Sequence, residues 1–146
     1  GFDRLWPRET CAADAPATAP LLNTRWRLVE IGDQPVTVAA GQRLAFISGQ
    51  GGDNPDGSFS PDFATQAASA FRNVGLALAA LGATAQNVAK ITVLIVDHDM
   101  DKLRIMQAAQ RVLFGAHHPA ATLIPVPCLA LPQMLIEVEA IAALPA

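Results

Sequence analysis

The chain has 146 residues, of which 51% are hydrophobic and 16% are charged, with a formal net charge of −3. A chain of this length fits one domain that buries about two thirds of its unfolded surface. The negative charge and the lack of a Lys/Arg run exclude strong attraction to a phosphate backbone, so we expect no nucleic-acid partner. The high hydrophobic fraction predicts an oligomer in which another subunit covers apolar surface.

No apolar run reaches the roughly 20 residues of a membrane span, and residues 1–20 lack a signal-peptide pattern. We therefore expect a soluble cytoplasmic protein with no membrane partner, although a signal removed before Gly1 would place it in the periplasm. The two cysteines, Cys11 and Cys128, fit neither a disulfide framework nor a metal motif. Cys128 is expected to pack as a small hydrophobe.

Composition divides the N-terminal part of the chain into two segments, residues 1–21 and residues 22–40. Residues 1–21 are rich in Pro, Ala and Thr and predict an arm or linker. We expect a single domain over residues 22–146, beginning with an atypical strand pair over 22–40 that turns at Gly32-Asp33.

A third strand is predicted at residues 43–48 (RLAFIS), followed by a glycine-rich loop at 49–57. Four glycines in this loop let the backbone approach a ligand closely. The loop lacks both the Gly-Lys-Ser/Thr ending of a Walker motif and a GxGxxG turn, so a nucleotide cofactor is not expected.

Two helices are predicted from apolar residues that recur at three- and four-residue steps. The first runs from Phe63 to Leu81, with a start signal at Asp62 and a stop at Gly82. The second spans 101–114 and ends at Gly115.

Between the helices, the β-branched run at 89–96 (AKITVLIV) predicts a buried central strand. Asp97, His98 and Asp99 follow it. They fit the start of a helix better than a metal site, because no second cluster has the spacing to complete a coordination shell. We expect no metal.

The last third of the chain, residues 119–142, contains two apolar runs around a Pro-bounded connection and predicts a strand pair. Ile136 and Val138 alternate with Glu137 and Glu139, so both glutamates share one face. An ionised carboxylate is costly to bury without a partner. Glu139 is therefore either a solvent-facing residue or a functional one.

Several segments, in this order and spacing, together resemble the RidA/YjgF family of small enamine and imine deaminases over about residues 43–142. They are FISGQ at 46–50, the helix QAASAFRNVGLALAALGA from Gln66, VAKITVLIVDHDMDKL from Val88, a helix closing at LFG, and the strands PAATLIPV and LIEVEAIA. The resemblance implies a chorismate-mutase-like α+β fold, with a mixed sheet and two helices packed on one face. It also implies a homotrimeric barrel with ligand clefts between subunits.

This resemblance implies a substrate-binding cleft and a catalytic carboxylate, Glu139, that positions the attacking water. The expected cleft residues are Ser48, Gly49, Gln50, Gln107, Ala121 and Thr122. Ala121 stands where deaminating members carry an arginine that holds the substrate carboxylate, a contact that alanine cannot make. The chain also has no Tyr to supply the family's aromatic wall.

The function implied is hydrolysis of the C=N bond of an enamine or imine metabolite, with no cofactor. The alternative is a catalytically silent ligand-binding or interaction protein of the same fold, which the loss of the arginine favours. Arg25, Arg27, Arg43 and Arg104 are either candidates to replace that arginine or solvated surface charges. A ribonuclease activity, ascribed to some relatives, fits poorly with the acidic charge.

A second, shorter resemblance lies at residues 22–36. LNTRWRLVEIGDQPV is similar to the first hairpin of META (HslJ-like) domains. Because the segment is too short for a complete META domain, we interpret it as an alternative N-terminal strand pair attached to the Rid-like core.

Overall fold

The computed structural model describes residues 30–31, 34–35 and 43–144. The chain divides after Val38 into two units. The first contains a short antiparallel hairpin, in which β1 (Glu30–Ile31) pairs with β2 (Gln34–Pro35). This pairing lies on either side of Gly32-Asp33, as the predicted strand pair requires. The predicted arm over residues 1–21 lies outside the described residues, and so does the rest of the 22–40 strand pair and of the META-like segment 22–36.

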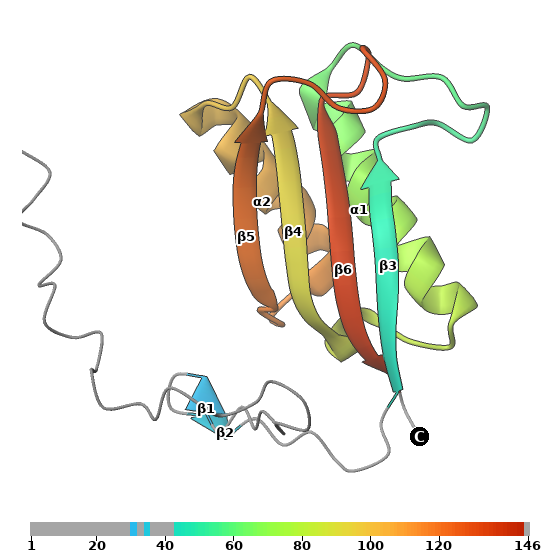
Figure 1. Ribbon diagram of the computed structural model, residues 1–146, viewed down its shortest axis with the longest axis vertical. Helices are drawn as coiled ribbons and strands as arrows, with labels where there is room; N and C mark the ends of the chain where they lie inside the picture. Colours follow the sequence, from blue (N-terminus) through green and yellow to red (C-terminus); the bar gives the residue numbers. More distant parts are fainter. Residues whose placement is uncertain (1–29, 32–33, 36–42, 145–146) are drawn as a thin grey trace, which may run out of the picture. The chain divides into compact units, whose positions relative to one another are not determined.

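The second unit is a four-stranded mixed sheet with both helices on one face (Figure 1). The strand order is β3-β6-β4-β5; β4 and β5 run parallel, and the other pairs are antiparallel. The α+β class and the predicted order of strands and helices are confirmed. The elements are β3 (Arg43–Gly51), α1 (Phe63–Ala80), the 3-10 helix η1 (Ala85–Asn87), β4 (Val88–Val96), α2 (Met100–Phe114), β5 (Ala120–Val126) and β6 (Ile136–Leu144).

The predicted pairing of the last two strands is wrong. β5 and β6 are not neighbours, because β4 lies between them and pairs with both. β6 buries every second residue and takes an interior position with a partner on each side, whereas β5 has no fully buried residue and forms the sheet edge. A strand is buried most completely between two other strands, so the more buried β6 takes an interior position and the less buried β5 takes the edge.

The third strand is longer than predicted. β3 continues to Gly51, three residues into the predicted loop, with a register shift between Ile47 and Gln50. The extension pairs Gln50 with Val138 and Gly51 with Glu137. A bulge of this kind lets a strand keep its partner while local backbone direction changes.

The helix boundaries follow the predicted signals. Asp62 accepts a hydrogen bond from the Thr65 amide at 2.8 Å and begins α1. Asp99 accepts one from the Lys102 amide at 2.7 Å and begins α2, which confirms its interpretation as an N-cap. Gly115 ends α2 with a φ of 58°, a value that glycine adopts without strain.

The core fills the space between the sheet and the two helices. Phe71 of α1 meets Phe114 of α2 edge to face, with ring centroids 6.3 Å apart. The largest fully buried apolar side chains around them are Val74, Leu78, Val88, Ile91, Val93, Ile95, Ile136 and Val138.

One polar side chain, Gln66 of α1, is fully buried in this core. Its amide donates to the carbonyl oxygens of Ser60 (2.7 Å) and Gln133 (2.8 Å) and accepts from the Leu135 amide (2.9 Å). Buried polar groups are tolerated when they are hydrogen bonded in this way. Gln66 therefore joins α1 to the loops that precede α1 and β6.

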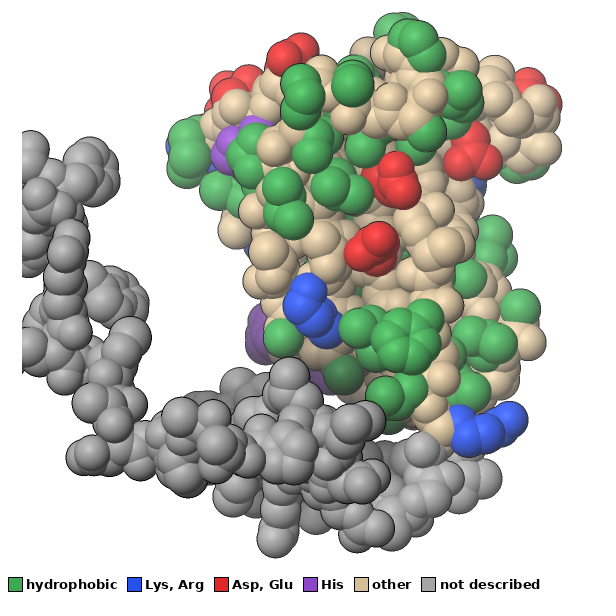
Figure 2. All heavy atoms as spheres, in the orientation of Figure 1, with side chains coloured by type: hydrophobic (Ala, Val, Ile, Leu, Met, Phe, Trp, Pro, Cys, Tyr) green, Lys and Arg blue, Asp and Glu red, His purple; other side chains and the backbone are tan. Residues whose placement is uncertain are grey.

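Neither helix covers the opposite face of the sheet, which is called the open face below. Exposed apolar side chains on it include Phe46 (75% exposed), Leu44 and Ile124. Figure 2 shows hydrophobic side chains together with acidic and basic ones over this face. Cys128, expected to be packed, is instead exposed in the connection between β5 and β6.

Candidate functional site

Five of the predicted site residues lie on the two opposite edge strands of the sheet. Ser48, Gly49 and Gln50 belong to β3, whereas Ala121 and Thr122 belong to β5. β6 and β4 lie between these strands. With about 4.8 Å between neighbouring strands, the two groups are roughly 14 Å apart. A single chain therefore does not bring them into one cleft.

Glu139 lies on β6 in the middle of the open face and is exposed within the chain. It faces Thr92 of β4, which in turn faces Thr122 of β5. Paired residues project from the same side of a sheet, so these three side chains form a polar row. Ser48 and Glu139 also line a shallow hollow of about 250 Å³, with Phe46 and Ile141 as apolar neighbours.

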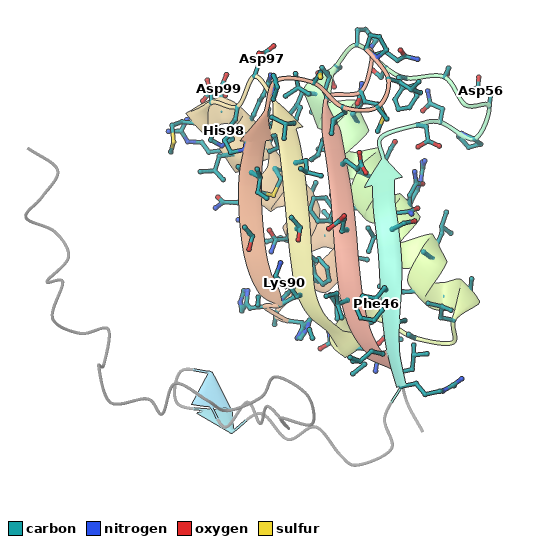
Figure 3. All side chains as sticks on the ribbon, viewed as in Figure 1. Phe46, Asp56, Lys90, Asp97, His98 and Asp99 are labelled. Carbon is teal, nitrogen blue, oxygen red and sulfur yellow. The ribbon has the colours of Figure 1, made fainter. Side chains whose placement is uncertain are left out.

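A lysine extends this polar row. Lys90 of β4 donates a hydrogen bond from Nζ to Thr92 Oγ1 at 3.0 Å. Figure 3 labels Lys90 and Phe46 in a view onto the open face. Neither Lys90 nor Thr92 was predicted as a site residue, although the alternation in AKITVLIV places both on one face. The row thus contains a cation and a carboxylate on adjacent strands.

Glu137 of β6 lies directly beside Gly49, the first residue of the predicted glycine-rich segment. It shares the open face with Glu139, as expected from their spacing. A Cβ atom added to Gly49 would overlap Glu137 Oε1, so the carboxylate fits only because residue 49 has no side chain. The sequence pointed to Glu139, and no local signal distinguishes Glu137, because the β3 bulge sets this contact.

The Gln50 side chain folds back onto its own strand. Its Nε2 donates to the Ser48 carbonyl at 3.0 Å. Asn73 of α1 donates to the Gly51 carbonyl at 3.0 Å and attaches the helix to the same strand. These bonds hold the Ser48-Gly49-Gln50 segment in a defined conformation.

Ala121 and Gln107 lie on the helix side of the sheet. Ala121 pairs with the buried Ile91, whereas Thr122 pairs with Thr92 of the open face. Gln107 is an exposed residue of α2. Within one chain, Gln107 and Ala121 are therefore separated from Glu139 by the thickness of the sheet.

Of the four arginines proposed as replacements, the two that the structure describes, Arg43 and Arg104, give no anchor near Thr122. Arg104 forms an ion pair with Asp101 on the exposed surface of α2. Arg43 is exposed at the first residue of β3, at the far edge of the sheet from β5. Arg25 and Arg27 lie outside the described residues.

Within residues 43–144, no three His, Cys, Asp or Glu side chains are grouped closely enough to hold a metal ion. Asp97, His98 and Asp99 lie at the junction of β4 and α2 (Figure 3). The hydrogen bond from the Lys102 amide lowers the pKa of Asp99, as expected for a capping carboxylate. No helix in the described part is long and apolar enough to cross a membrane.

Comparisons with known proteins agree with this architecture. The model of the family described as endoribonuclease L-PSP matches residues 34–144. The RutC family protein YjgH of Escherichia coli is 32% identical over 102 residues, which cover 70% of this chain and 76% of YjgH.

Two solved structures extend the comparison. YyfB from Yersinia pestis, described as a Rid family protein of unknown function, has 31% identity and a TM-score of 0.65, covering 70% of this chain and 79% of YyfB. TdcF of E. coli, solved with bound serine, has 27% identity and a TM-score of 0.64, covering 80% and 91% of the two chains. The chain therefore belongs to the endoribonuclease L-PSP family, also called the YjgF/RidA family.

Proposed function

We propose that this protein binds a small polar metabolite in a cleft between subunits of a homotrimer and hydrolyses an enamine or imine C=N bond there. The observation that carries the proposal is that, within one chain, the predicted site residues are divided between the two edge strands of the sheet. Ser48, Gly49 and Gln50 lie on one edge strand, and Ala121 and Thr122 on the other. A second copy that places its β5 edge beside β3 would complete a cleft.

The open face supports the same assembly. Phe46 is 75% exposed and Leu44 56% exposed on a sheet face that neither helix covers. Burial of apolar surface is favourable by about 25 cal/mol per Å², so covering these side chains with other subunits would stabilise an oligomer. The polar row of Thr92, Thr122 and Glu139 would then lie inside the assembly.

The chemistry requires a carboxylate and hydrogen-bond donors near the C=N group. Glu139 would accept a proton from water as the water oxygen attacks the imine carbon, and would return it to the leaving nitrogen. The products are a carbonyl compound and ammonia. Backbone N–H groups near Gly49 and Thr122 would stabilise charge in the transition state. Glu137, beside Gly49, is the second candidate for this base.

The alternative is a ligand-binding protein with no catalytic activity. Ala121 provides no charged group to hold a substrate carboxylate, and Arg104 is already paired with Asp101. A ligand that is bound without being oriented for attack would not be hydrolysed efficiently.

A coupled assay separates these functions. An amino acid oxidase generates the imine, and hydrolysis is timed by loss of the imine in the presence and absence of the protein. Catalysis that is abolished by Glu139→Gln or by Glu137→Gln supports the deaminase and identifies the base. Binding without acceleration supports the silent alternative. Light scattering measures the mass in solution, and a monodisperse monomer would exclude the intersubunit cleft.

A further inference from the structure

A second cavity lies within a single subunit, between β3, the loop after it and α1. Its volume is about 650 Å³, within the range of small-molecule sites. The sequence pattern gave no role to α1 beyond packing against the sheet. The lining combines polar and apolar residues: Gly49, Gln50, Gly51, Asp53, Asn54, Pro55, Arg72, Asn73, Leu76 and Ala77.

The cavity contains one guanidinium and one carboxylate that do not pair with each other. Arg72 of α1 and Asp53 of the loop both line it. Within residues 43–144, the ion pair that forms is between Arg104 and Asp101, on a different helix. Opposite charges that share a cavity without meeting can each bind one end of a ligand that carries both charges.

The walls around these charges are held in place by contacts that exist without a ligand. Asn73 donates to the Gly51 carbonyl at 3.0 Å, and the Asn54 amide donates to the Ser58 carbonyl at 2.8 Å. A Cβ atom on Gly52 would overlap the backbone of Gln66, so the loop is packed directly on α1. A preformed site costs less conformational entropy on binding than one that must be ordered.

One wall of the cavity is apolar. Leu76 is 62% exposed although it faces the cavity, and Pro55 and Ala77 lie beside it. A ligand side chain that covered Leu76 would remove apolar surface from water. The ligand class is therefore a zwitterion with an apolar side chain.

We propose that this cavity binds a small α-amino acid, with the carboxylate at Arg72, the ammonium at Asp53 and the apolar side chain against Leu76. All the residues that line the site belong to one subunit. The site shares backbone at Gly49 and Gln50 with the proposed catalytic cleft, but amino-acid binding does not depend on catalysis. Amino-acid binding beside Gly49 gives the protein a way to sense the compounds from which imines are formed.

The test is titration calorimetry with three matched probes: L-leucine, 4-methylpentanoate, which lacks the amine, and 3-methylbutylamine, which lacks the carboxylate. L-leucine is expected to bind at least about 10-fold more tightly than either partial probe, since each loses one charged hydrogen bond. Arg72→Gln and Asp53→Asn should each weaken L-leucine binding by about 10-fold. Arg104→Gln, which removes an exposed arginine from α2, is the matched control and should leave binding unchanged.

Two further results separate this site from the proposed catalytic cleft. Glu139→Gln should leave L-leucine binding unchanged, and Arg72→Gln should keep the melting temperature of the wild type because its side chain is exposed. The proposal is overturned if L-leucine does not bind at millimolar concentration, or if Arg72→Gln binds it as tightly as the wild type. It is also overturned if Glu139→Gln abolishes binding, because the ligand would then occupy the open face.

Discussion

The carboxylate of Glu137 occupies the space in which any side chain at residue 49 would lie, so Glu137 can keep this position only while residue 49 is a glycine. The contact joins the bulged part of β3 to the open face of β6. It places a carboxylate directly beside the backbone that the proposed reaction requires.

Gly49→Ala is expected to destabilise the protein by about 1–3 kcal/mol, because the new methyl group must displace Glu137 or the strand. The free energy of unfolding in urea measures the effect. Glu137→Ala provides the control background, since it removes the overlapping atoms. A double-mutant cycle should give a coupling of about 1 kcal/mol or more. Equal losses in both backgrounds would show that the contact does not determine the requirement for glycine.

Ala121→Arg should raise the rate of hydrolysis of 2-iminopropanoate by about 30-fold to 1000-fold, because a guanidinium supplies roughly 2–4 kcal/mol of charged hydrogen bonding to the substrate carboxylate. Residue 121 is exposed, so the larger side chain fits without repacking the core. The coupled imine assay measures the rate. Ala121→Gln, similar in length but uncharged, is the control, and an equal gain from Gln would argue against charge as the cause.

Phe46→Glu should convert the proposed trimer into monomers. It places a charge on the open face, where the other subunits are expected to bury Phe46. Val112→Glu is the matched control, because Val112 is 88% exposed on α2, away from that face. Light scattering should give a reduced mass for the first variant alone. An unchanged mass for Phe46→Glu would place the subunit interface elsewhere.

Gln66→Met should lower the free energy of unfolding by about 2–4 kcal/mol, because it removes three hydrogen bonds that the buried Gln66 amide makes to the backbone of Ser60, Gln133 and Leu135. Gln107→Met makes the same chemical change at an exposed position of α2, and should alter stability by no more than about 0.5 kcal/mol. Urea unfolding of both variants tests the comparison. Similar values for the two would mean that the Gln66 bonds contribute little.

The stability contribution of Asp99 should depend on pH. The Lys102 amide, the largest cause, holds the pKa of Asp99 below its ordinary value of 3.8 in the folded protein. The ionised form therefore stabilises the fold. This contribution is complete above pH 3.8 and is lost as the pH falls through the lower folded pKa.

Asp99→Asn keeps a cap that does not titrate in this range. The difference in melting temperature between the wild type and this variant should be constant near neutral pH. In acid, the melting temperature of the wild type should fall more than that of the variant. A difference that stays constant down to about pH 2 would show that Asp99 does not act through its charge.

The sequence alone determined the elements whose causes are local. Asp62 and Asp99 begin the helices because each carboxylate bonds an amide three residues ahead. The alternating pattern also placed Glu137 and Glu139 on one face of the sheet, because neighbouring residues of a strand project to opposite sides. The resemblance to the RidA/YjgF family was also recognisable from the order and spacing of short segments, and the family match over residues 34–144 confirms this resemblance.

Only the tertiary structure decided which strands are neighbours and what meets across them. β4 separates β5 from β6, and the bulge in β3 brings Gly49 to Glu137, residues 88 positions apart in the chain. Arg72 and Asp53 share a cavity because α1 packs beside the loop after β3. Such contacts depend on how whole elements bury their apolar faces against one another, and no pattern within a few residues records that arrangement.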